Sequence, residues 1–174
     1  MRRAIHAFKY GGRTELAPPL AELMVSAWNE DPFPVDCIMP VPLHPARLRE
    51  RGYDQAALLA RELAAPIKLP VFAQGLERTR VTETQTRLSA PDRRKNVAGA
   101  FAAGAPCVKG RSVLLVDDVC TTGSTLDACA GVLRTVGAAN VYAFTLARAG
   151  WDPVTGAIGD AGFWQSDRIP KAIF

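Results

Sequence analysis

Long apolar segments are missing from this chain. No run of apolar residues approaches the roughly 20 that a helix needs to cross a bilayer, and no secretory signal opens the sequence. Hydrophobic residues make up 48% of the 174 residues and charged residues 22%, which is ordinary for a water-soluble globular protein. The sequence therefore predicts a cytoplasmic protein with a single domain and a sizeable core.

Paired cysteines are also missing. No Cys-x-x-Cys motif occurs among the four cysteines, which are Cys37, Cys107, Cys120 and Cys129. Their spacing supports neither a zinc knuckle nor a disulfide framework, so free buried thiols are expected. The net charge of +4 suits anionic ligands such as polyphosphates as well as weak nucleic-acid contact, so it does not distinguish these partners.

Two common phosphate-binding motifs are absent too: the Gly-Lys-Ser/Thr ending of a P-loop, and a GxGxxG after a strand. The chain has instead the stretch VLLVDDVCTTGST at residues 113–125. Its first four residues form a short apolar run, typical of a strand buried on both faces of a parallel sheet. Asp117 and Asp118 follow, then a hydroxyl-rich turn, then a helical pattern of apolar residues from Leu126 to Val136.

Each part of this stretch has a chemical use. A turn at a helix N-terminus presents unpaired backbone N–H groups to a phosphate. The residues expected to serve it are Thr121, Thr122, Gly123, Ser124 and Thr125. Asp117 and Asp118 would repel the same phosphate, so their expected partners are sugar hydroxyls or a bridging Mg²⁺. A phosphorylated ribose has both features. A plain core strand with a solvated turn remains an alternative, and a phospho-acceptor receiver domain would leave the hydroxyls unexplained.

These residues resemble a known family signature. Residues 113–125 resemble the phosphoribosyl-pyrophosphate (PRPP) signature of type I phosphoribosyltransferases, in which two acids precede Thr/Ser-Gly-x-Thr. Three further stretches resemble the ComF group of that superfamily: PVPLH at 40–44 with RGYDQ at 51–55, residues 76–101, and TLAR at 145–148. The resemblance implies an α/β phosphoribosyltransferase fold over residues 1–148, with a parallel sheet of four or five strands, helices on both faces and a flexible hood loop. Residues 149–174 form a tail that is expected to pack on the same domain.

The second predicted site segment follows a strand expected at residues 35–41. Pro40, Pro42 and Pro45 make a rigid loop at the carboxyl end of that strand, where ligands bind in open α/β sheets. The resemblance implies that this is the pyrophosphate loop, formed by Val41, Pro42, Leu43, His44 and Arg47. Backbone amides would bind the pyrophosphate, and Arg47, Arg49 or Arg51 would neutralise it. His44 is expected to be a surface hydrogen-bonding residue. A proline-stiffened connection with solvated arginines is the alternative.

The most polar part of the chain, residues 76–96, has no sustained strand pattern. Such a segment is usually a solvated face, but a long polar loop between core elements often forms a lid. The resemblance implies a hood that closes over PRPP and excludes water. Its matching polar positions are Arg78, Arg80, Gln85, Arg87, Arg94 and Asn96. We expect at least one of these arginines to reach the pyrophosphate, and a short helix from Ser89 to Val97.

The remaining elements follow from periodicity and caps. We expect helices at residues 1–10, 18–29 and 54–64, a short strand at 69–72 and a strand at 138–147. Asp54 is predicted to cap the third helix and Pro66 to end it. From Gly150 onwards neither period is evident.

The resemblance implies that the protein binds PRPP with Mg²⁺ and transfers the phosphoribosyl group to a nucleobase or another amine, releasing pyrophosphate. Mg²⁺ would be held through the pyrophosphate, with Asp117 and Asp118 as further candidates. Three alternatives stay open: a non-catalytic ComF-type module in DNA uptake with competence or DNA-processing partners, a PRPP sensor, and a plain interaction protein. The sequence does not identify the acceptor of the phosphoribosyl group, and it does not decide whether the protein forms a homodimer. The cysteine-rich zinc-binding segment that usually precedes Lys9-Tyr10-Gly11 in this group is not in the sequence.

Overall fold

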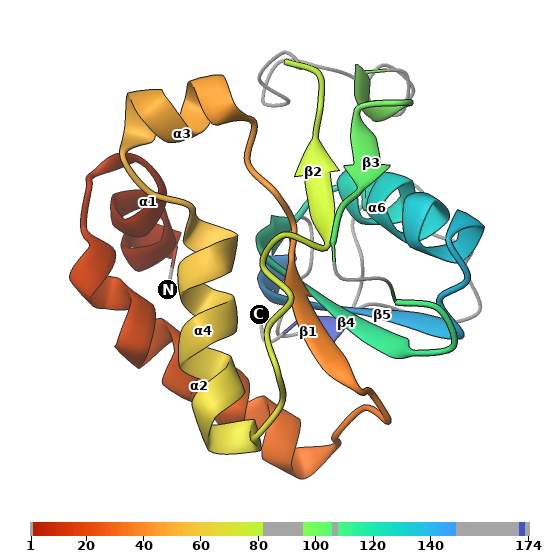
Figure 1. The fold of residues 1–174 in the computed structure, drawn as a ribbon. Helices are drawn as coiled ribbons and strands as arrows, with labels where there is room; N and C mark the ends of the chain where they lie inside the picture. Colours follow the sequence, from red (N-terminus) through yellow and green to blue (C-terminus); the bar gives the residue numbers. More distant parts are fainter. Residues whose placement is uncertain (1, 82–95, 106–107, 149–170, 173–174) are drawn as a thin grey trace.

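The computed structural model describes residues 2–81, 96–105, 108–148 and 171–172. A four-stranded sheet with the order β1-β4-β5-β6 forms its centre, and every neighbouring pair of strands is parallel (Figure 1). The strands are β1 (Cys37–Pro40), β4 (Ser112–Cys120), β5 (Asn140–Arg148) and β6 (Lys171–Ala172). The predicted α/β class with a parallel sheet is confirmed.

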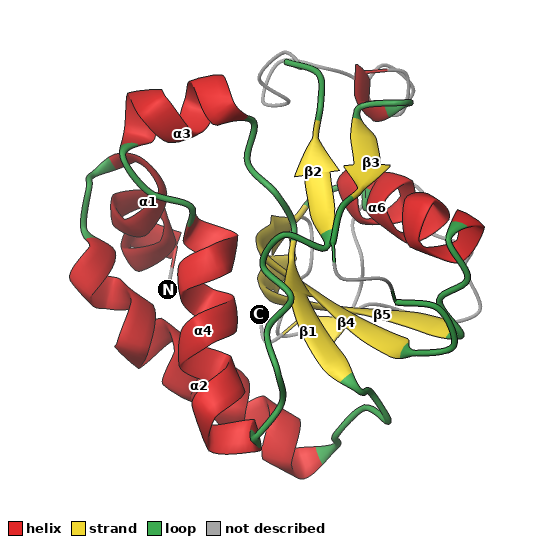
Figure 2. Cartoon of the chain, viewed as in Figure 1, coloured by secondary structure: helices red, strands yellow, loops and turns green. Residues whose placement is uncertain are grey.

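Helices cover both faces of this sheet (Figure 2). The helices are α1 (Arg2–Tyr10), α2 (Ala17–Glu30), α3 (Pro45–Arg51), α4 (Gln55–Ile67) and α6 (Ser124–Thr135), with a 3-10 turn η1 (Thr14–Leu16) between α1 and α2. Leu114 and Val116 of β4 pack with α1, α2 and α4, whereas Val113 and Leu115 pack with α6. This alternation is expected of a strand that is buried on both faces. None of the described helices is both long and apolar enough to span a membrane.

The ends of the helices follow local sequence signals. The side chain of Asp54 accepts the Ala57 N–H at 3.0 Å and so caps α4 as predicted. The prediction that Pro66 ends this helix is wrong: α4 continues to Ile67, and Lys68 ends it in the left-handed conformation with φ 56°. Because Pro66 lies in the last turn, its ring can be tolerated while the N–H of Lys68 bonds the carbonyl of Ala64.

Two predicted strand assignments need correction. Residues 76–78 form β2 (Leu76–Arg78), which pairs antiparallel with β3 (Phe101–Ala103) in a separate two-stranded sheet, although no strand was expected there. Leu76 and Phe101 are buried in the core beside α6, and three residues are too few to show a periodic pattern. The strand predicted at 69–72 is reduced to one bridge between Val71 and Ile38. The helix predicted to start at Ser89 lies outside the described residues.

The tail and the thiols complete the fold. The tail was predicted to lack periodic structure, but β6 pairs Lys171 and Ala172 with Phe144 and Thr145 of β5. Two residues again carry too short a pattern to be recognised. The three described cysteines, Cys37, Cys120 and Cys129, are buried and free as expected, and burial raises the pKa of each thiol. Cys107 lies outside the described residues.

Candidate functional site

The two signature acids lie inside strand β4 and not after it. The sequence placed the end of the strand at Val116, but pairing with β5 continues through Asp117↔Thr145 to Cys120↔Arg148. The ladder continues because β5 runs parallel to β4 as far as Arg148 and supplies partners for the additional residues. Successive side chains of a strand point to opposite faces, so Asp117 and Asp118 face opposite sides of the sheet.

Asp118 is the more enclosed of the two acids. The residue is 3% exposed, and its Oδ1 accepts a hydrogen bond of 2.8 Å from Lys9 Nζ at the end of α1. Its Oδ2 is buried and has no hydrogen-bond partner among the described residues. A buried polar atom that lacks a partner costs about 1–3 kcal/mol. This oxygen therefore has the chemistry to accept a hydroxyl from a ligand.

Lys9 was not among the predicted site residues. It precedes Asp118 by 109 positions, and α1 gave only a short amphipathic pattern. The Lys9-Tyr10-Gly11 stretch belongs to the ComF resemblance, which was the one signal that could have drawn attention to it.

Asp117 is half-buried and lies in a different electrostatic environment. Burial, followed by the negative charge of Asp118, raises the pKa of Asp117 to about 7. The charge of Lys9 and the backbone N–H of Asp118, which donates to Asp117 Oδ1 at 2.8 Å, act in the opposite direction. The carboxylate of Asp117 therefore changes its charge near neutral pH.

The predicted phosphate turn connects β4 to α6. Gly123 occupies the N-cap position of α6 with φ 79°, a left-handed conformation that favours glycine. The hydroxyls of Thr122 and Ser124 are hydrogen-bonded to each other at 2.8 Å. Gly123 has no side chain with which to cap α6, and the hydroxyl of Thr122 accepts the Ser124 N–H only over a long 3.5 Å, so α6 presents the positive end of its dipole at the turn. The structure therefore brings Asp117, Asp118 and residues 121–125 together at one end of β4.

The predicted pyrophosphate loop, residues 41–44, lies beside the end of β4. Val41 donates its N–H to the carbonyl of Val116 at 2.9 Å, and Leu43 donates to Asp54 Oδ2 at 3.1 Å. Pro42 has no N–H to offer. A pyrophosphate contact through the amides of Val41 or Leu43 would therefore require these two bonds to change partners. His44 accepts the Ala46 N–H through Nδ1 and caps α3, consistent with its expected hydrogen-bonding role.

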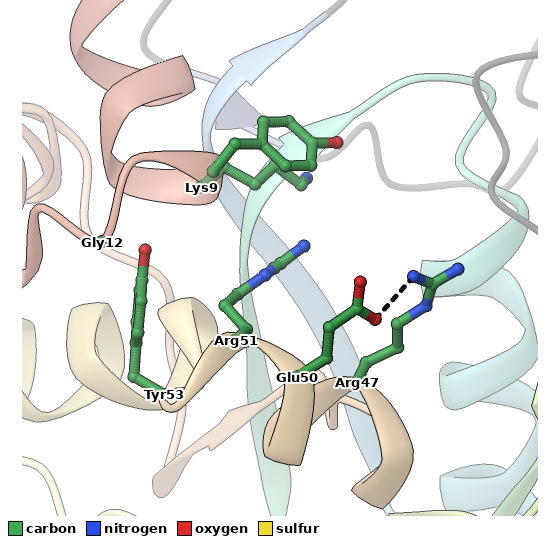
Figure 3. Close-up of a pocket in the computed structure, with 7 residues that line it drawn as sticks. Lys9, Gly12, Arg47, Glu50, Arg51 and Tyr53 are labelled. Atoms are coloured by element: carbon green, nitrogen blue, oxygen red, sulfur yellow. Dashed lines mark hydrogen bonds and ion pairs between the residues drawn. The ribbon is translucent and has the colours of Figure 1, made fainter.

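Arg47 lies in a basic cavity of about 230 Å³ between α1 and α3. The lining residues are Lys9, Tyr10, Gly12, Arg47, Glu50, Arg51 and Tyr53. In Figure 3 the side chains of Arg47, Glu50 and Arg51 point from α3 into the space beside Lys9. Arg47 Nη1 pairs with Glu50 Oε2 at 2.8 Å, and the Arg51 guanidinium lies 5.4 Å from the ring centre of Tyr10. Three cations and one carboxylate make this cavity suitable for an anion.

Three of the predicted hood residues are described. Arg78 in β2 stacks its guanidinium 5.2 Å from the ring centre of Phe101, and burial lowers its pKa while the charge of Asp117 acts in the opposite direction. Arg80 Nη2 donates to the carbonyls of Asn96 at 2.9 Å and Ala98 at 2.8 Å. Arg80 thus links the two described ends of the hood. The predicted positions Gln85, Arg87 and Arg94 lie outside the described residues.

Whether this site can bind the predicted Mg²⁺ depends on how Asp117 and Asp118 are placed. Among residues 2–81, 96–105, 108–148 and 171–172, no three His, Cys, Asp or Glu side chains gather as a metal cluster. Asp117 and Asp118 face opposite sides of β4, so the pair suits two separate ribose hydroxyls better than it suits one small ion. Mg²⁺ commonly binds through substrate phosphates with one or two carboxylates. The residues of this site therefore suit an Mg²⁺ ion that is bound mainly by pyrophosphate oxygens and by at most one of the two carboxylates.

Comparisons with known proteins agree with this geometry. Residues 48–154 match the family model of the phosphoribosyl transferase domain. The chain is 42% identical over 116 residues to Competence protein F of Haemophilus influenzae, covering 66% of this chain and 51% of that protein. It is 38% identical over 149 residues to DNA utilization protein YhgH of Escherichia coli, covering 83% of this chain and 65% of that protein. The chain therefore spans about half to two thirds of the length of these relatives.

A solved structure shows the same fold. Glutamine PRPP amidotransferase from Bacillus subtilis matches with a TM-score of 0.56 at 21% identity, covering 81% of this chain and 30% of that chain. The fold and the signature strand together define a phosphoribosyltransferase-like α/β domain. The chain belongs to the phosphoribosyl transferase domain family, and its resemblance to the ComF group within that superfamily is confirmed.

Proposed function

We propose that this protein binds PRPP with Mg²⁺ and transfers the phosphoribosyl group to a nitrogen nucleophile, releasing pyrophosphate. The observation that carries the proposal is the end of β4, where Oδ2 of Asp118 is buried without a hydrogen-bond partner among the described residues and lies close in sequence to the N-terminus of α6, whose N-cap residue Gly123 has no capping side chain. One feature suits a sugar hydroxyl and the other suits a phosphate.

The 5′-phosphate binds at the turn formed by residues 121–125. The first turn of α6 and the hydroxyls of Thr122 and Ser124 supply the donors, and the absence of a side chain at Gly123 allows close approach. The ribose hydroxyls donate to Asp117 and Asp118. Because Asp117 has a pKa of about 7, its ionised fraction, and hence its ability to accept a hydroxyl, increases as the pH rises from 6 to 8.

Transfer breaks the bond between C1 of the ribose and the pyrophosphate oxygen, and forms a bond between C1 and the acceptor nitrogen, which then loses a proton to solvent. Positive charge develops on the sugar ring while negative charge grows on the leaving group. Arg47 and Arg51, which line the cavity after the loop at residues 41–44, lower the energy of that negative charge. The amides of Val41 and Leu43 contribute once they exchange their present partners, Val116 and Asp54, for the pyrophosphate. Bound Mg²⁺ would add charge neutralisation on the pyrophosphate oxygens.

The hood excludes water from the activated sugar in this proposal. Arg78 and Arg80 belong to its described base, where Arg80 bonds two backbone carbonyls and Arg78 is influenced by the charge of Asp117. Gln85, Arg87, Arg94 and Asn96 are the other proposed hood residues. The surrounding charges act mainly by electrostatic stabilisation, and no strong general base is required.

The names of the relatives favour a second candidate. Proteins called Competence protein F and DNA utilization protein suggest that a ComF-type module could bind PRPP as a signal during DNA uptake in the cytoplasm, without transferring it. The two candidates share the PRPP site and differ in whether pyrophosphate is released.

Isothermal titration with PRPP and Mg²⁺ tests the shared site. We expect saturable binding that Asp117→Asn and Asp118→Asn each abolish while circular dichroism shows an intact fold; Glu62→Gln, an exposed carboxylate on α4, should bind like the unaltered protein. If both Asn variants keep their affinity for PRPP, PRPP does not bind at Asp117 and Asp118. Pyrophosphate release is then measured over a panel of nucleobases and small amines. Release with one acceptor supports the transferase, and release with none favours the PRPP-binding module.

A further inference from the structure

Lys9 brings a positive charge to the signature strand from a distant part of the chain. Its Nζ lies 2.8 Å from Asp118 Oδ1, and the two side chains are 27% and 4% exposed. Burial lowers the pKa of Lys9, but the charges of Asp118 and Asp117 raise it by more, so the ammonium stays protonated at neutral pH. A charge-assisted hydrogen bond of this length fixes both partners more firmly than a solvated surface pair would.

The backbone that carries Lys9 is itself anchored. Phe8 is fully buried in the core, and its carbonyl accepts a hydrogen bond from the hydroxyl of Tyr53. The carbonyl of Lys9 accepts a second hydrogen bond, of 3.2 Å, from Nε2 of the buried Gln55. Gln55 is the first residue of α4, and Tyr53 lies two residues before it. The end of α1 is therefore attached to the core on both sides of the position from which Lys9 reaches Asp118.

The two carboxylate oxygens of Asp118 differ in their hydrogen bonding. Oδ1 is held by Lys9, whereas Oδ2 is buried with no hydrogen-bond partner among the described residues. A carboxylate held through one oxygen cannot rotate freely, so the direction of the other oxygen is fixed as well. We propose that Lys9 is a positioning residue of the phosphoribosyl site, which holds Asp118 so that Oδ2 accepts a ribose hydroxyl. This inference rests on the proposed PRPP function.

Two other roles for Lys9 make different predictions. If Lys9 only adds positive charge near the site, its removal weakens every anionic ligand to a similar extent. If Lys9 occupies the place of the ribose hydroxyl, its removal strengthens sugar binding. A positioning role predicts instead a larger loss for ligands that carry the sugar, because inorganic phosphate, whether at the turn of residues 121–125 or in the basic cavity that Lys9 lines, does not need Asp118.

The test compares ribose 5-phosphate with inorganic phosphate by isothermal titration on the full chain. Lys9→Met should lower the affinity ratio of ribose 5-phosphate to phosphate by about 10- to 100-fold, the range for one hydrogen bond to a charged group. Lys9→Arg should restore part of the ratio because it keeps a charged donor. The matched control is Arg3→Met, an exposed cation on the same helix, and it should leave the ratio unchanged.

A double variant shows whether Lys9 acts through Asp118. Asp118→Asn keeps the phosphate-binding turn, and adding Lys9→Met to it should lower the affinity ratio of ribose 5-phosphate to phosphate no further than Asp118→Asn alone. Additive losses would contradict the positioning role. If Lys9→Met fails to fold by circular dichroism, Lys9→Gln keeps a hydrogen-bond donor without the charge, and the same ratio is measured on that variant.

The possible failures are distinguishable. If the unaltered protein binds neither PRPP nor ribose 5-phosphate, this result contradicts both the proposed function and the role of Lys9. An unaltered protein that binds both, with a ratio that Lys9→Met and Lys9→Gln leave unchanged or increase, removes the role of Lys9 alone.

Discussion

Two neighbouring carboxylates in β4 have different surroundings, and this difference is the main feature of the site at the scale of residues. Asp118 is enclosed and paired with Lys9, whereas Asp117 is half-buried with a pKa raised to about 7. Natural proteins accept local instability of this kind mainly where a function needs it. The stability of the protein should therefore respond to pH through Asp117.

Asp117→Asn should stabilise the protein strongly at pH 8 and by less than ~1 kcal/mol at pH 4. Folded Asp117 keeps its proton up to about pH 7, whereas the unfolded side chain loses it near its ordinary pKa of 3.8. Between these values the folded state binds more protons, so the free energy of unfolding falls as the pH rises. Asparagine does not titrate, so Asp117→Asn avoids this decrease in the free energy of unfolding, which reaches up to ~4 kcal/mol at pH 8. Urea denaturation of both proteins between pH 4 and 8 measures the difference.

The control for this pH series is Glu62→Gln, which removes an exposed carboxylate from α4. Its stability should follow that of the unaltered protein at every pH. If Asp117→Asn instead loses stability relative to the unaltered protein at pH 8, the carboxylate of Asp117 is satisfied when ionised and its raised pKa is wrong.

Gly123→Ala should destabilise the protein and weaken phosphate binding. Gly123 has a φ of 79°, and a left-handed conformation costs an L-residue with a side chain about 1–2 kcal/mol. A matched control lies in the same helix: Gly131 is exposed, and a Cβ added there meets nothing within 4 Å. Gly131→Ala should therefore stabilise α6 by about 0.5–1 kcal/mol. Urea denaturation and phosphate titration of both variants check the contrast; equal effects would mean that the conformation of Gly123 is unimportant.

At the scale of elements, long periodic patterns predicted the structure well and short ones did not. The helices near residues 1–10, 18–29, 54–64 and 126–136 and the strand near 138–147 are all present, because each repeats its pattern over several residues. β2, β3 and β6 span three, three and two residues, so their pairing depends on distant partners that no local pattern records.

The candidate site divides in the same way. Asp117, Asp118 and the turn at residues 121–125 could be predicted because they are contiguous in the sequence. Lys9 could not, because its contact with Asp118 is created by the packing of α1 through Phe8 against the core. The acids were also placed beyond the strand, because charged residues are unusual in a buried strand and only the partner β5 shows that the ladder continues.

Asp54 connects two elements of the site, and Asp54→Ala should weaken both. Its Oδ1 caps α4 through the Ala57 N–H, and its Oδ2 accepts the Leu43 N–H of the proposed pyrophosphate loop. Loss of the cap and of the loop anchor should lower stability by ~1–3 kcal/mol and reduce affinity for PRPP. Asp54→Asn has one carbonyl oxygen and can keep one of the two bonds, so its stability should be intermediate.

Thermal unfolding and PRPP titration measure both effects of Asp54. If Asp54→Ala loses stability but binds PRPP with unchanged affinity, the anchored conformation of residues 41–44 does not contribute to the site.

At the scale of the whole molecule, the sheet brings together segments that are far apart in the sequence. β1 and β4 are parallel neighbours, so the loop after β1 and the turn after β4 emerge at the same edge. Helix α1 adds Lys9 on one face, and the hood strands pack beside α6 on the other (Figure 1). A ligand that contacts several of these segments should stabilise the folded protein as a unit.

PRPP with Mg²⁺ should therefore raise the melting temperature. At a ligand concentration of 100 times Kd, mass action contributes about 2.7 kcal/mol, which corresponds to roughly 5–10 °C for a chain of this size. The shift should disappear in Asp118→Asn and persist in Arg3→Met. An equal shift in all three proteins would indicate binding elsewhere on the surface.

A crystal structure of the unaltered chain with PRPP and Mg²⁺ would show directly whether the end of β4 binds a phosphoribosyl group. We expect the 5′-phosphate at residues 121–125 and a ribose hydroxyl within hydrogen-bond distance of Asp118 Oδ2, with Lys9 still bonded to Oδ1. A structure in which PRPP binds away from the end of β4, or in which side chains fill that position and leave no room for a sugar phosphate, would contradict this expectation.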